Sequence, residues 1–509
     1  MAVFHSIISK ISSNRLKEID QFRLSPGKVQ TKALEELLST AKDTEWGRKY
    51  GFKNINDIRD FQSRLPISTY EELKKDIERS MRGEKNILWP GITQWYAKSS
   101  GTSCDKSKFI PITQDSLKKC HYKAGLDVLW IYANNYPETG IVHGKNLCLG
   151  GSHQISSFNN KSYTGDLSAI IIENLPFITQ LKNVPRPSIT LIPDFEEKIK
   201  KVAEATINEN ISSFSGVPSW FLVLIKHILE VTGKSNLLEV WPNLEAFIHG
   251  GVHFEPYREQ YKRLIPSEKM NYMETYNASE GFFSLQDEPG KDDMLLMLDL
   301  GIFMEFIPMS EFGYENPTIL SIEEVETDTN YALVISTNTG LWRYILGDTI
   351  KFTSTYPHKI KITGRTKHFI NAFGEEVIVD NAEKALQAAC RITSASISDY
   401  TAGPVYMNAK SKGAHQWLIE FEKEPDNLEV FSYELDKALK SLNSDYEAKR
   451  HKNLALEPPL IVSMQKGTFY QWMKKRGKIG GQNKIPRLSN DRKYLDQLLI
   501  VNERLLNQK

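Results

Sequence analysis

Four short segments of the chain carry residues suited to binding a nucleotide and a charged intermediate. The first, Ser99-Ser100-Gly101-Thr102-Ser103, is a run of hydroxyl side chains around a glycine, with Lys106 and Lys108 close behind. Backbone amides and hydroxyls in such a run can converge on phosphate oxygens, while the lysines supply positive charge. The spacing of a Walker loop is absent. Taken alone, these residues fit either a phosphate-binding loop or a solvated turn.

The second segment is Thr275-Tyr276-Asn277-Ala278-Ser279-Glu280-Gly281, in which an aromatic ring precedes a carboxylate by four residues. The ring could stack on a nucleotide base while the carboxylate holds Mg²⁺. The same spacing is also commonplace on ordinary helices, so both interpretations stay open.

The third segment is Gly340-Leu341-Trp342-Arg343-Tyr344-Ile345-Leu346-Gly347-Asp348. Strand-like residues flank Asn338-Thr339-Gly340, which predicts a hairpin turn. Gly347 then allows Asp348 to be presented in a loop, where its carboxylate could accept both hydroxyls of a ribose. Alternatively, Arg343 and Asp348 simply pair across the strands of the hairpin.

The fourth segment lies near the C-terminus: Gly480-Gly481-Gln482-Asn483-Lys484-Ile485-Pro486-Arg487. A glycine pair followed by a lysine suits a loop that swings a cation onto a charged intermediate. A basic surface loop is the alternative.

In order and spacing, the four segments resemble the auxin-responsive acyl-acid amido synthetases. These enzymes belong to the adenylate-forming superfamily, together with acyl-CoA synthetases and luciferases. The resemblance covers essentially the whole chain, and the GLWRYILGD segment and the GTFYQWM…GGQNKIPR tail look specific to the amido synthetases. We expect a bacterial-type member. The chain is shorter than the plant enzymes, so their hormone-recognition loops need not be present.

The resemblance implies a role for each matching residue. Tyr276 would stack on adenine, Glu280 would ligate Mg²⁺, and Asp348 would bind the ribose hydroxyls. Lys484, Thr102 and Glu280 would be the catalytic residues, the lysine reaching the phosphate and the reacting carboxylate. The full set implied to bind ATP or AMP is Ser99, Ser100, Gly101, Thr102, Ser103, Tyr276, Ser279, Glu280, Arg343, Asp348, Arg365 and Lys484.

Two further features follow from the same resemblance. Arg343 would support the loop that carries Asp348, and Gly364-Arg365 resembles the hinge about which a smaller domain turns between half-reactions. The acid itself would contact residues from the segments 212–220 and 247–255: Ser213, Val217, Gly250, Gly251 and His253. For His249 and His253, a satisfied structural role is the favoured interpretation over a place in the acid pocket.

The implied reaction uses ATP and Mg²⁺. The carboxylate of the acid would attack the α-phosphorus, forming an acyl-adenylate and releasing pyrophosphate, with charge stabilisation as the main task of the protein. The acyl group would then pass to an amine, in particular an amino acid. The alternatives are an acyl-CoA synthetase with a thiol acceptor and a catalytically inactive protein that binds a nucleotide or an acid.

These segments need a large scaffold, and the chain has 509 residues. The apolar residues Leu34, Leu37, Leu38 and Ala41 recur at helical spacing, which predicts a helical N-terminal region. Further along, helix patterns at 195–207, 219–231 and 381–391 alternate with strand patterns at 188–192, 246–249, 332–337 and 359–363. We expect an α/β fold. A large multi-layer domain with mostly parallel and mixed sheets would span residues 1–365. A hinge region (366–380) would lead to a smaller, mobile α+β domain (381–509) with the lysine loop.

Composition narrows the function classes. The formal charge of +1 disfavours a nucleic-acid partner. The four cysteines, with no CxxC pair, indicate free thiols in a reducing compartment and not a metal site. The N-terminus lacks a signal-peptide pattern and no apolar run could span a bilayer, so we expect a cytoplasmic protein that binds small molecules only.

Overall fold

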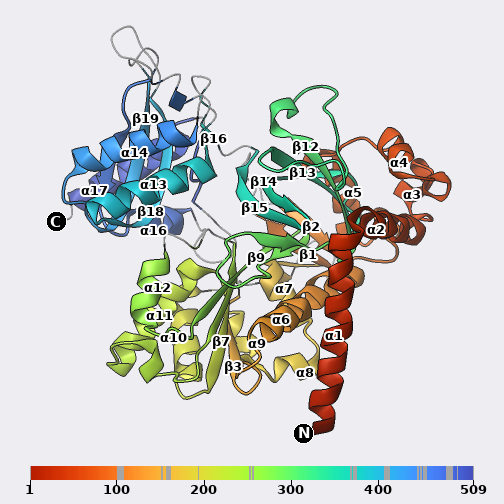
Figure 1. Cartoon of the computed structure of the whole chain (residues 1–509), viewed down its shortest axis with the longest axis horizontal. Helices are drawn as coiled ribbons and strands as arrows, with labels where there is room; N and C mark the ends of the chain where they lie inside the picture. The colour runs from red at the N-terminus through yellow and green to blue at the C-terminus, as the bar shows by residue number, and fades with distance from the viewer. Residues whose placement is uncertain are drawn as a thin grey trace. The chain divides into compact units, whose positions relative to one another are not determined.

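The structure is a computed structural model of the whole chain (Figure 1). It describes residues 2–99, 108–150, 153–155, 162–192, 194–251, 254, 257–366, 369–370, 375, 377–405, 413–443, 446–447, 450, 456–476, 485–489 and 491–507. The chain divides into two compact units. Unit 1 comprises Met1–Phe254, Glu259–Leu346 and Ile350–Lys361, and unit 2 comprises Glu255–Arg258, Gly347–Thr349 and Ile362–Lys509. The expected α/β class, with a mixed sheet in the larger part and a smaller C-terminal part, is confirmed.

A large mixed sheet has the strand order β12-β13-β14-β15-β11-β10-β9-β8-β7-β3-β6. The run β6-β3-β7-β8-β9 is parallel, whereas β9, β10, β11 and β15 pair antiparallel, as do β12 and β13. The strands are β3 (Lys145–Cys148), β6 (Asn183–Val184), β7 (Ile211–Gly216), β8 (Ala246–Gly250), β9 (Asn271–Ala278), β10 (Gly281–Leu285), β11 (Met294–Leu296), β12 (Ile302–Pro308), β13 (Asn330–Thr337), β14 (Tyr344–Thr355) and β15 (His358–Arg365).

Helices cover both faces of the parallel strands, with α10 and α11 on one side and α6 and α7 on the other (Figure 1). The helices are α1 (Ala2–Leu24), α2 (Pro26–Ala41), α3 (Glu45–Lys49), α4 (Ile58–Arg64), α5 (Tyr70–Met81), α6 (Lys123–Asn135), α7 (Leu167–Glu173), α8 (Phe177–Gln180), α9 (Pro187–Thr190), α10 (Phe195–Thr206), α11 (Pro218–Thr232) and α12 (Arg258–Leu264). Short 3₁₀ turns are η1 (Phe52–Asn54), η3 (Leu237–Glu239) and η5 (Met309–Glu311), and η2 (Ser116–Tyr122) is a π-helical turn.

Local sequence explains several of these elements. In α2 the predicted apolar positions Leu34, Leu37, Leu38 and Ala41 are all buried. Helix α11 begins with proline at its first position, where the missing N–H costs nothing, and ends at a left-handed glycine.

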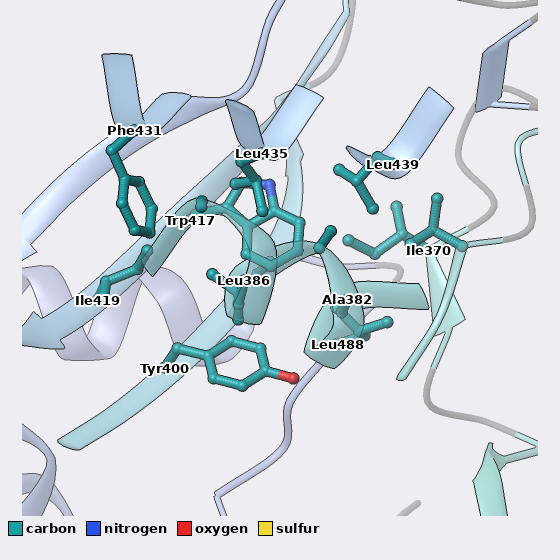
Figure 2. Packing of buried hydrophobic residues seen from close by; sticks show 14 of the residues in the cluster. Ile370, Ala382, Leu386, Tyr400, Trp417, Ile419, Phe431, Leu435, Leu439 and Leu488 are labelled. Atoms are coloured by element: carbon teal, nitrogen blue, oxygen red, sulfur yellow. The ribbon is translucent and has the colours of Figure 1, made fainter. Parts of the chain in front are cut away.

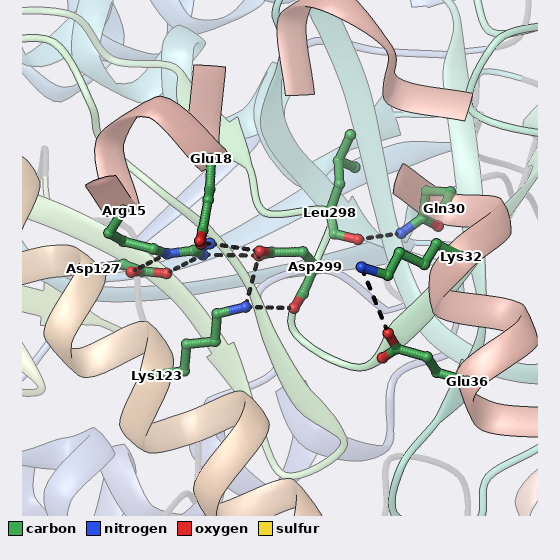
Figure 3. A network of polar contacts seen from close by, with 9 residues as sticks. All are labelled: Arg15, Glu18, Gln30, Lys32, Glu36, Lys123, Asp127, Leu298 and Asp299. Atoms are coloured by element: carbon green, nitrogen blue, oxygen red, sulfur yellow. Dashed lines mark hydrogen bonds and ion pairs between the residues drawn. The ribbon is translucent and has the colours of Figure 1, made fainter. Parts of the chain in front are cut away.

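An ion-pair network fastens α1 to other elements of unit 1 (Figure 3). The Arg15 guanidinium donates to both oxygens of Asp127 on α6 at 2.8 and 2.7 Å, and to Asp299 at 2.5 and 2.8 Å. The Lys123 ammonium also contacts Asp299, at 2.8 Å. The network joins α1, α6 and the turn that follows β11.

A second sheet in unit 1 frames the hydroxyl-rich segment. Its strand order is β2-β1-β5-β4, built from β1 (Trp95–Ser99), β2 (Lys108–Ile112), β4 (His153–Ile155) and β5 (Tyr163–Gly165). Ser99 pairs with Lys108 in the antiparallel register of β1 and β2. The segment between them is therefore bounded by two residues that lie opposite each other in the β1–β2 register.

Unit 2 is built around a compact apolar core (Figure 2). Trp417, Tyr400, Phe431 and Leu435 lie in it and are at most 2% exposed. Its strands are β16 (Phe369–Ile370), β17 (Val377–Ile378), β18 (Ser396–Val405), β19 (Ala414–Lys423) and β20 (Leu460–Met464), and its helices are α13 (Val379–Thr393), α14 (Leu428–Leu442), α16 (Thr468–Lys475) and α17 (Lys493–Leu506).

The other element predictions have one error. The helix patterns at 195–207, 219–231 and 381–391 correspond to α10, α11 and α13, and the strand patterns at 246–249, 332–337 and 359–363 to β8, β13 and β15. The strand predicted at 188–192 is wrong, because this segment contains α9. Pro187 occupies the first helical position there, and the Thr190 hydroxyl donates to the Pro185 carbonyl. Within the described residues, no helix is long and apolar enough to cross a membrane.

Candidate active site

The carboxyl ends of the parallel strands β7 and β8 bring together most of the residues expected to hold the acid. Gly216 at the end of β7 is opposite His249 on β8, and Gly250 is opposite Thr275 on β9. A β-carbon at Gly251 would lie 3.5 Å from the Val217 side chain. In parallel sheets this edge is where ligands bind.

Close approach explains the glycine at position 250. A β-carbon there would lie 2.4 Å from the Thr275 carbonyl oxygen, which leaves no room for a side chain. Gly251 has φ +84°, in the left-handed region that favours glycine. The glycine pair therefore makes the turn at the end of β8.

His249 lies next to the end of β8, whereas Ser213 lies three residues before the end of β7, opposite Ala246 at the start of β8. The Ser213 hydroxyl donates to the Asn146 side chain at 3.1 Å and the residue is 3% exposed. The His249 ring stacks on Phe254 with centroids 4.3 Å apart. These contacts agree with the structural interpretation of His249. His253 lies outside the described residues, and its expected role stays a prediction.

The Tyr276–Glu280 segment spans the end of β9 and the turn into β10. The Tyr276 ring packs on Phe283 with centroids 4.8 Å apart and is 5% exposed. Glu280 is 7% exposed and Ser279 1% exposed. Because β9 is the parallel neighbour of β8, this turn lies at the same sheet edge as the Gly250–Gly251 turn.

The phosphate-loop candidates lie mostly outside the described residues. Ser99 ends β1, whereas Ser100, Gly101, Thr102 and Ser103 belong to the undescribed segment. On the far side of that segment, the Lys108 ammonium lies 3.3 Å from the hydroxyl of Tyr344, the first residue of β14. This contact links the base of the loop to the Gly340–Asp348 segment.

Arg343 is buried and its guanidinium is engaged by protein groups, so its expected role toward the nucleotide stays a prediction. Its Nε and Nη2 donate to the two Glu305 carboxylate oxygens, each at 2.9 Å, and its Nη1 donates to the carbonyls of Gln62 and Leu65 at 2.9 and 2.6 Å. Four of the five guanidinium N–H groups are thereby used. Arg343 is 2% exposed and has φ +43°, an uncommon value for a residue with a side chain.

Asp348 pairs with Arg365 in unit 2. Arg365 Nε lies 3.1 Å from Asp348 Oδ1, and the Asp348 side chain is 13% exposed. The preceding residue, Gly347, has φ +91°, and its carbonyl accepts from the Thr366 amide at 2.9 Å. Asp348 and Arg365, which are both expected to bind the nucleotide, are therefore in contact. The alternative pairing of Arg343 with Asp348 is wrong, because each has another partner.

Lys484 lies outside the described residues, but the segment that follows it is firmly held in unit 2. Thr401 on β18 donates to the Pro486 carbonyl at 2.6 Å, and the Ala402 amide donates to the Arg487 carbonyl at 2.8 Å. The Arg487 guanidinium also pairs with Asp399. These contacts anchor the chain two and three residues beyond the expected catalytic lysine.

Magnesium fits the carboxylate at the β9–β10 turn. Mg²⁺ is usually held by one or two carboxylates together with substrate phosphates. Glu280 offers such a carboxylate beside the residues expected to bind ATP. Within the described ranges, no group of three or more His, Cys, Asp or Glu side chains could enclose a metal ion. The donor set suits a cation shared with a phosphate substrate.

Two buried groups near these residues were not singled out from sequence. Glu305, which pairs with Arg343, is 0% exposed and lies on another strand. His121 is 6% exposed and lies on η2. The preceding residue of the same turn, Cys120, accepts a hydrogen bond from the Phe282 amide of β10 at 3.3 Å. Glu305 could have been recognised from sequence as a buried carboxylate, because it is the charged residue inside the apolar run 302–308. No sequence signal distinguishes His121 from a surface histidine.

Comparisons with known proteins cover nearly the whole chain. Residues 15–270 match the GH3 family N-terminal domain, residues 295–365 the GH3 family central domain and residues 380–493 the GH3 family C-terminal domain. The indole-3-acetic acid-amido synthetase GH3.3 of Arabidopsis thaliana is 23% identical, over 93% of this chain and 91% of its own. The jasmonoyl–L-amino acid synthetase JAR4 of Nicotiana attenuata is 21% identical, over 90% and 89% respectively.

Solved structures show the same fold. An AtGH3.15 acyl acid amido synthetase in complex with 2,4-DB superposes with a TM-score of 0.78 at 18% identity, covering 96% of each chain. A 2-hydroxyisobutyryl-CoA ligase superposes with a TM-score of 0.57 at 12% identity, covering 94% of this chain and 91% of its own. The expectation of a bacterial-type member stays a prediction. The N-terminal match alone spans more than half of the sequence, and the chain belongs to the GH3 family.

Proposed function

We propose that the chain is an ATP-dependent ligase that activates a carboxylic acid as an acyl-adenylate and transfers the acyl group to an amine, in particular an amino acid. The names of its relatives, an indole-3-acetic acid-amido synthetase and a jasmonoyl–L-amino acid synthetase, support an acid and an amino acid as substrates. Both the acid and the amine would be small molecules.

The observation that carries the proposal is the shared carboxyl edge of β8 and β9. The Gly250–Gly251 turn, expected to hold the acid, adjoins the strand that ends at Tyr276 and leads to Glu280. An acid and a nucleotide bound at one edge would be oriented for reaction, and such positioning supplies much of the rate in a reaction with little proton transfer.

In adenylation, the acid oxygen attacks the α-phosphorus and pyrophosphate leaves, so negative charge grows on the phosphoryl oxygens. Mg²⁺, when bound, neutralises part of that charge, and Glu280 would hold it. The hydroxyls around Thr102 and the Lys484 ammonium would stabilise the rest. Asp348 and Arg365 would bind the ribose. Arg343 would act indirectly, by holding the start of β14.

In the second half-reaction, a neutral amine attacks the acyl carbonyl and AMP leaves. A thiol acceptor such as coenzyme A is the alternative, since the fold is shared with a CoA ligase. The amido synthetase names of the relatives favour the amine. A cytoplasmic location stays a prediction.

Acid-dependent ATP–pyrophosphate exchange tests the first half-reaction. A panel of carboxylic acids is screened with the full chain, and Glu280→Gln is compared with Glu268→Gln, which changes an exposed carboxylate outside the site. We expect Glu280→Gln to lower exchange by at least about 100-fold and Glu268→Gln to leave it unchanged. Lys484→Ala should abolish exchange while ATP still binds. Equal exchange in the two glutamine variants would contradict the assigned role of Glu280.

A further inference from the structure

Arg487 lies in a cluster of charged and aromatic side chains in unit 2, three residues after the expected catalytic lysine. Its guanidinium pairs with Asp399 on β18 and donates to the Tyr400 carbonyl at 3.0 Å. The same group lies over the Tyr400 ring, 4.7 Å from the centroid, and its Nε is 3.9 Å from a carboxylate oxygen of Glu383. A guanidinium has five N–H donors in one plane, so Arg487 can hold several partners at once.

Backbone hydrogen bonds hold the chain around Arg487 independently of its side chain. The Ala402 amide donates to the Arg487 carbonyl at 2.8 Å, and the Ser489 amide donates to the Ala402 carbonyl at 3.0 Å. Leu488, between them, is 0% exposed and belongs to the apolar core of unit 2 (Figure 2). The backbone of residues 487–489 is therefore fixed alongside β18, and the guanidinium is left to make contacts with other segments.

One of these contacts comes from a distant part of the sequence. Tyr257 is 5% exposed, and its hydroxyl accepts a hydrogen bond from the Arg487 guanidinium. A buried tyrosine hydroxyl needs such a partner. Tyr257 belongs to the segment Glu255–Arg258, which is part of unit 2 although the chain on both sides of it, up to Phe254 and from Glu259, is part of unit 1. The hydrogen bond therefore lies within unit 2 but is made by a residue that unit 1 flanks in sequence.

The place of Tyr257 in the chain connects this contact with the acid. Tyr257 follows Gly251, in the turn assigned to the acid, by six residues, which span at most about 20 Å when extended. Arg487 follows Lys484 by three residues, which span at most about 11 Å. The hydrogen bond therefore ties the acid turn to the lysine loop through two short stretches of chain. In a reaction that depends on positioning, such a limit on the separation of the reacting groups contributes to the rate.

We propose that Tyr257 is a positioning residue for adenylation: its hydroxyl fixes the Arg487 guanidinium, and through it the loop that carries Lys484, within reach of the bound acid and ATP. This inference rests on the proposed function. Lys484 is assigned to the charge that grows on the phosphoryl oxygens as pyrophosphate leaves. Loss of the Tyr257 hydroxyl should therefore slow adenylation selectively. The transfer step, in which an amine attacks the acyl carbonyl and AMP leaves, should be spared.

The test measures the two half-reactions separately in the full chain carrying Tyr257→Phe, which keeps the ring and removes the hydroxyl. Adenylation is followed by ATP–pyrophosphate exchange with the best acid among benzoate, 3-phenylpropionate, hexanoate and decanoate. Transfer is followed with the synthetic acyl-adenylate of that acid and a mixture of amino acids. We expect kcat for exchange to fall about 10-fold, with the KM for ATP and the rate of transfer unchanged. Tyr433→Phe, at an exposed tyrosine of α14, is the matched control and should change neither half-reaction.

A second variant tests whether the hydroxyl acts through Arg487. Arg487→Lys keeps a positive charge beside Asp399 but loses the planar set of donors, so it should also slow exchange and spare transfer. Because Tyr257 and Arg487 act as one unit in this proposal, the double variant should be no slower in exchange than Arg487→Lys alone.

Each outcome bears on the proposal. Wild-type exchange in Tyr257→Phe, or an equal slowing of both half-reactions, would overturn it and leave the proposed function standing, since both half-reactions still occur. Effects of the two substitutions that add up in the double variant would overturn it as well. The absence of exchange with every acid in the wild-type chain would overturn both the proposed function and this inference. If Tyr257→Phe does not fold, Arg487→Lys decides, because half-reactions that are unchanged or equally slowed in that variant refute the role of the pair.

Discussion

Replacing Arg343 by methionine should destabilise unit 1 strongly, because it leaves a buried carboxylate without its cation. Glu305 is 0% exposed and accepts two hydrogen bonds from Arg343, each at 2.9 Å. Gln62 is its other polar neighbour, with Nε2 3.0 Å from Oε1. Removing one member of a buried ion pair typically costs about 3–5 kcal/mol. The carbonyls of Gln62 and Leu65 would also lose their donor, so we expect a loss near the upper end of that range.

A double substitution separates the ion pair from the packing. Glu305→Leu combined with Arg343→Met removes both charges and keeps an apolar core, which is often close to neutral. We expect the double variant to be about 2 kcal/mol more stable than Arg343→Met alone, so that the two effects are strongly coupled.

The assay is urea unfolding followed by circular dichroism and by tryptophan fluorescence, to which the neighbouring Trp342 contributes. Two probes are needed because a chain of two units can unfold in more than one transition. An Arg343→Met variant within about 1 kcal/mol of wild type, or a double variant at least as unstable as the sum of the single ones, would refute this explanation of the buried pair.

Three further perturbations test other parts of the structure. Arg15→Met removes the common partner of the Glu18, Asp127 and Asp299 carboxylates in Figure 3 and should cost about 3 kcal/mol in the free energy of unfolding, which an unchanged melting temperature would contradict. Gly250→Ala places a β-carbon 2.4 Å from the Thr275 carbonyl and should lower kcat/KM for the acid by about 100-fold, whereas Gly125→Ala, with open space around it, should be silent in the same exchange assay. The pKa of His121 is lowered to about 4 in the folded chain. Between about pH 6.5 and about pH 4 the imidazole therefore takes up a proton in the unfolded chain and not in the folded one. Stability should therefore drop by about 2 kcal/mol between about pH 7 and about pH 5, and urea midpoints for His121→Phe should lack that part of the decrease.

Sequence patterns predicted the elements whose identity is decided locally. The spacing of Leu34, Leu37 and Leu38 specified the buried face of α2, and alternating apolar segments specified β8 and β13. The same reasoning failed at residues 188–192, where β-branched residues suggested a strand. The proline at the first position and the bond from Thr190 to the preceding turn favoured a short helix instead.

Some features of the candidate site depend on local sequence and could be predicted, whereas others depend on residues far apart in the chain and could not. The left-handed Gly347 before Asp348 is a local feature, and its presentation of that carboxylate could be predicted from the dipeptide. The partner of Arg343 could not, since Glu305 lies 38 residues away and reaches it only through the order of strands in the sheet. His121 was missed for a similar reason. It follows two lysines on a helical pattern, and only the packing of η2 on β10 shows that it is buried.

The central claim is that this chain joins an acid to an amine through an acyl-adenylate. The most direct measurement incubates the full chain with ATP, Mg²⁺, an acid that supports pyrophosphate exchange and a mixture of amino acids, and then detects the products by mass spectrometry. A parallel reaction contains coenzyme A in place of the amino acids. The account predicts AMP and an N-acyl amino acid in equal amounts, with no turnover beyond adenylate formation when coenzyme A is the acceptor. Formation of an acyl-CoA thioester, with no amide, would contradict it.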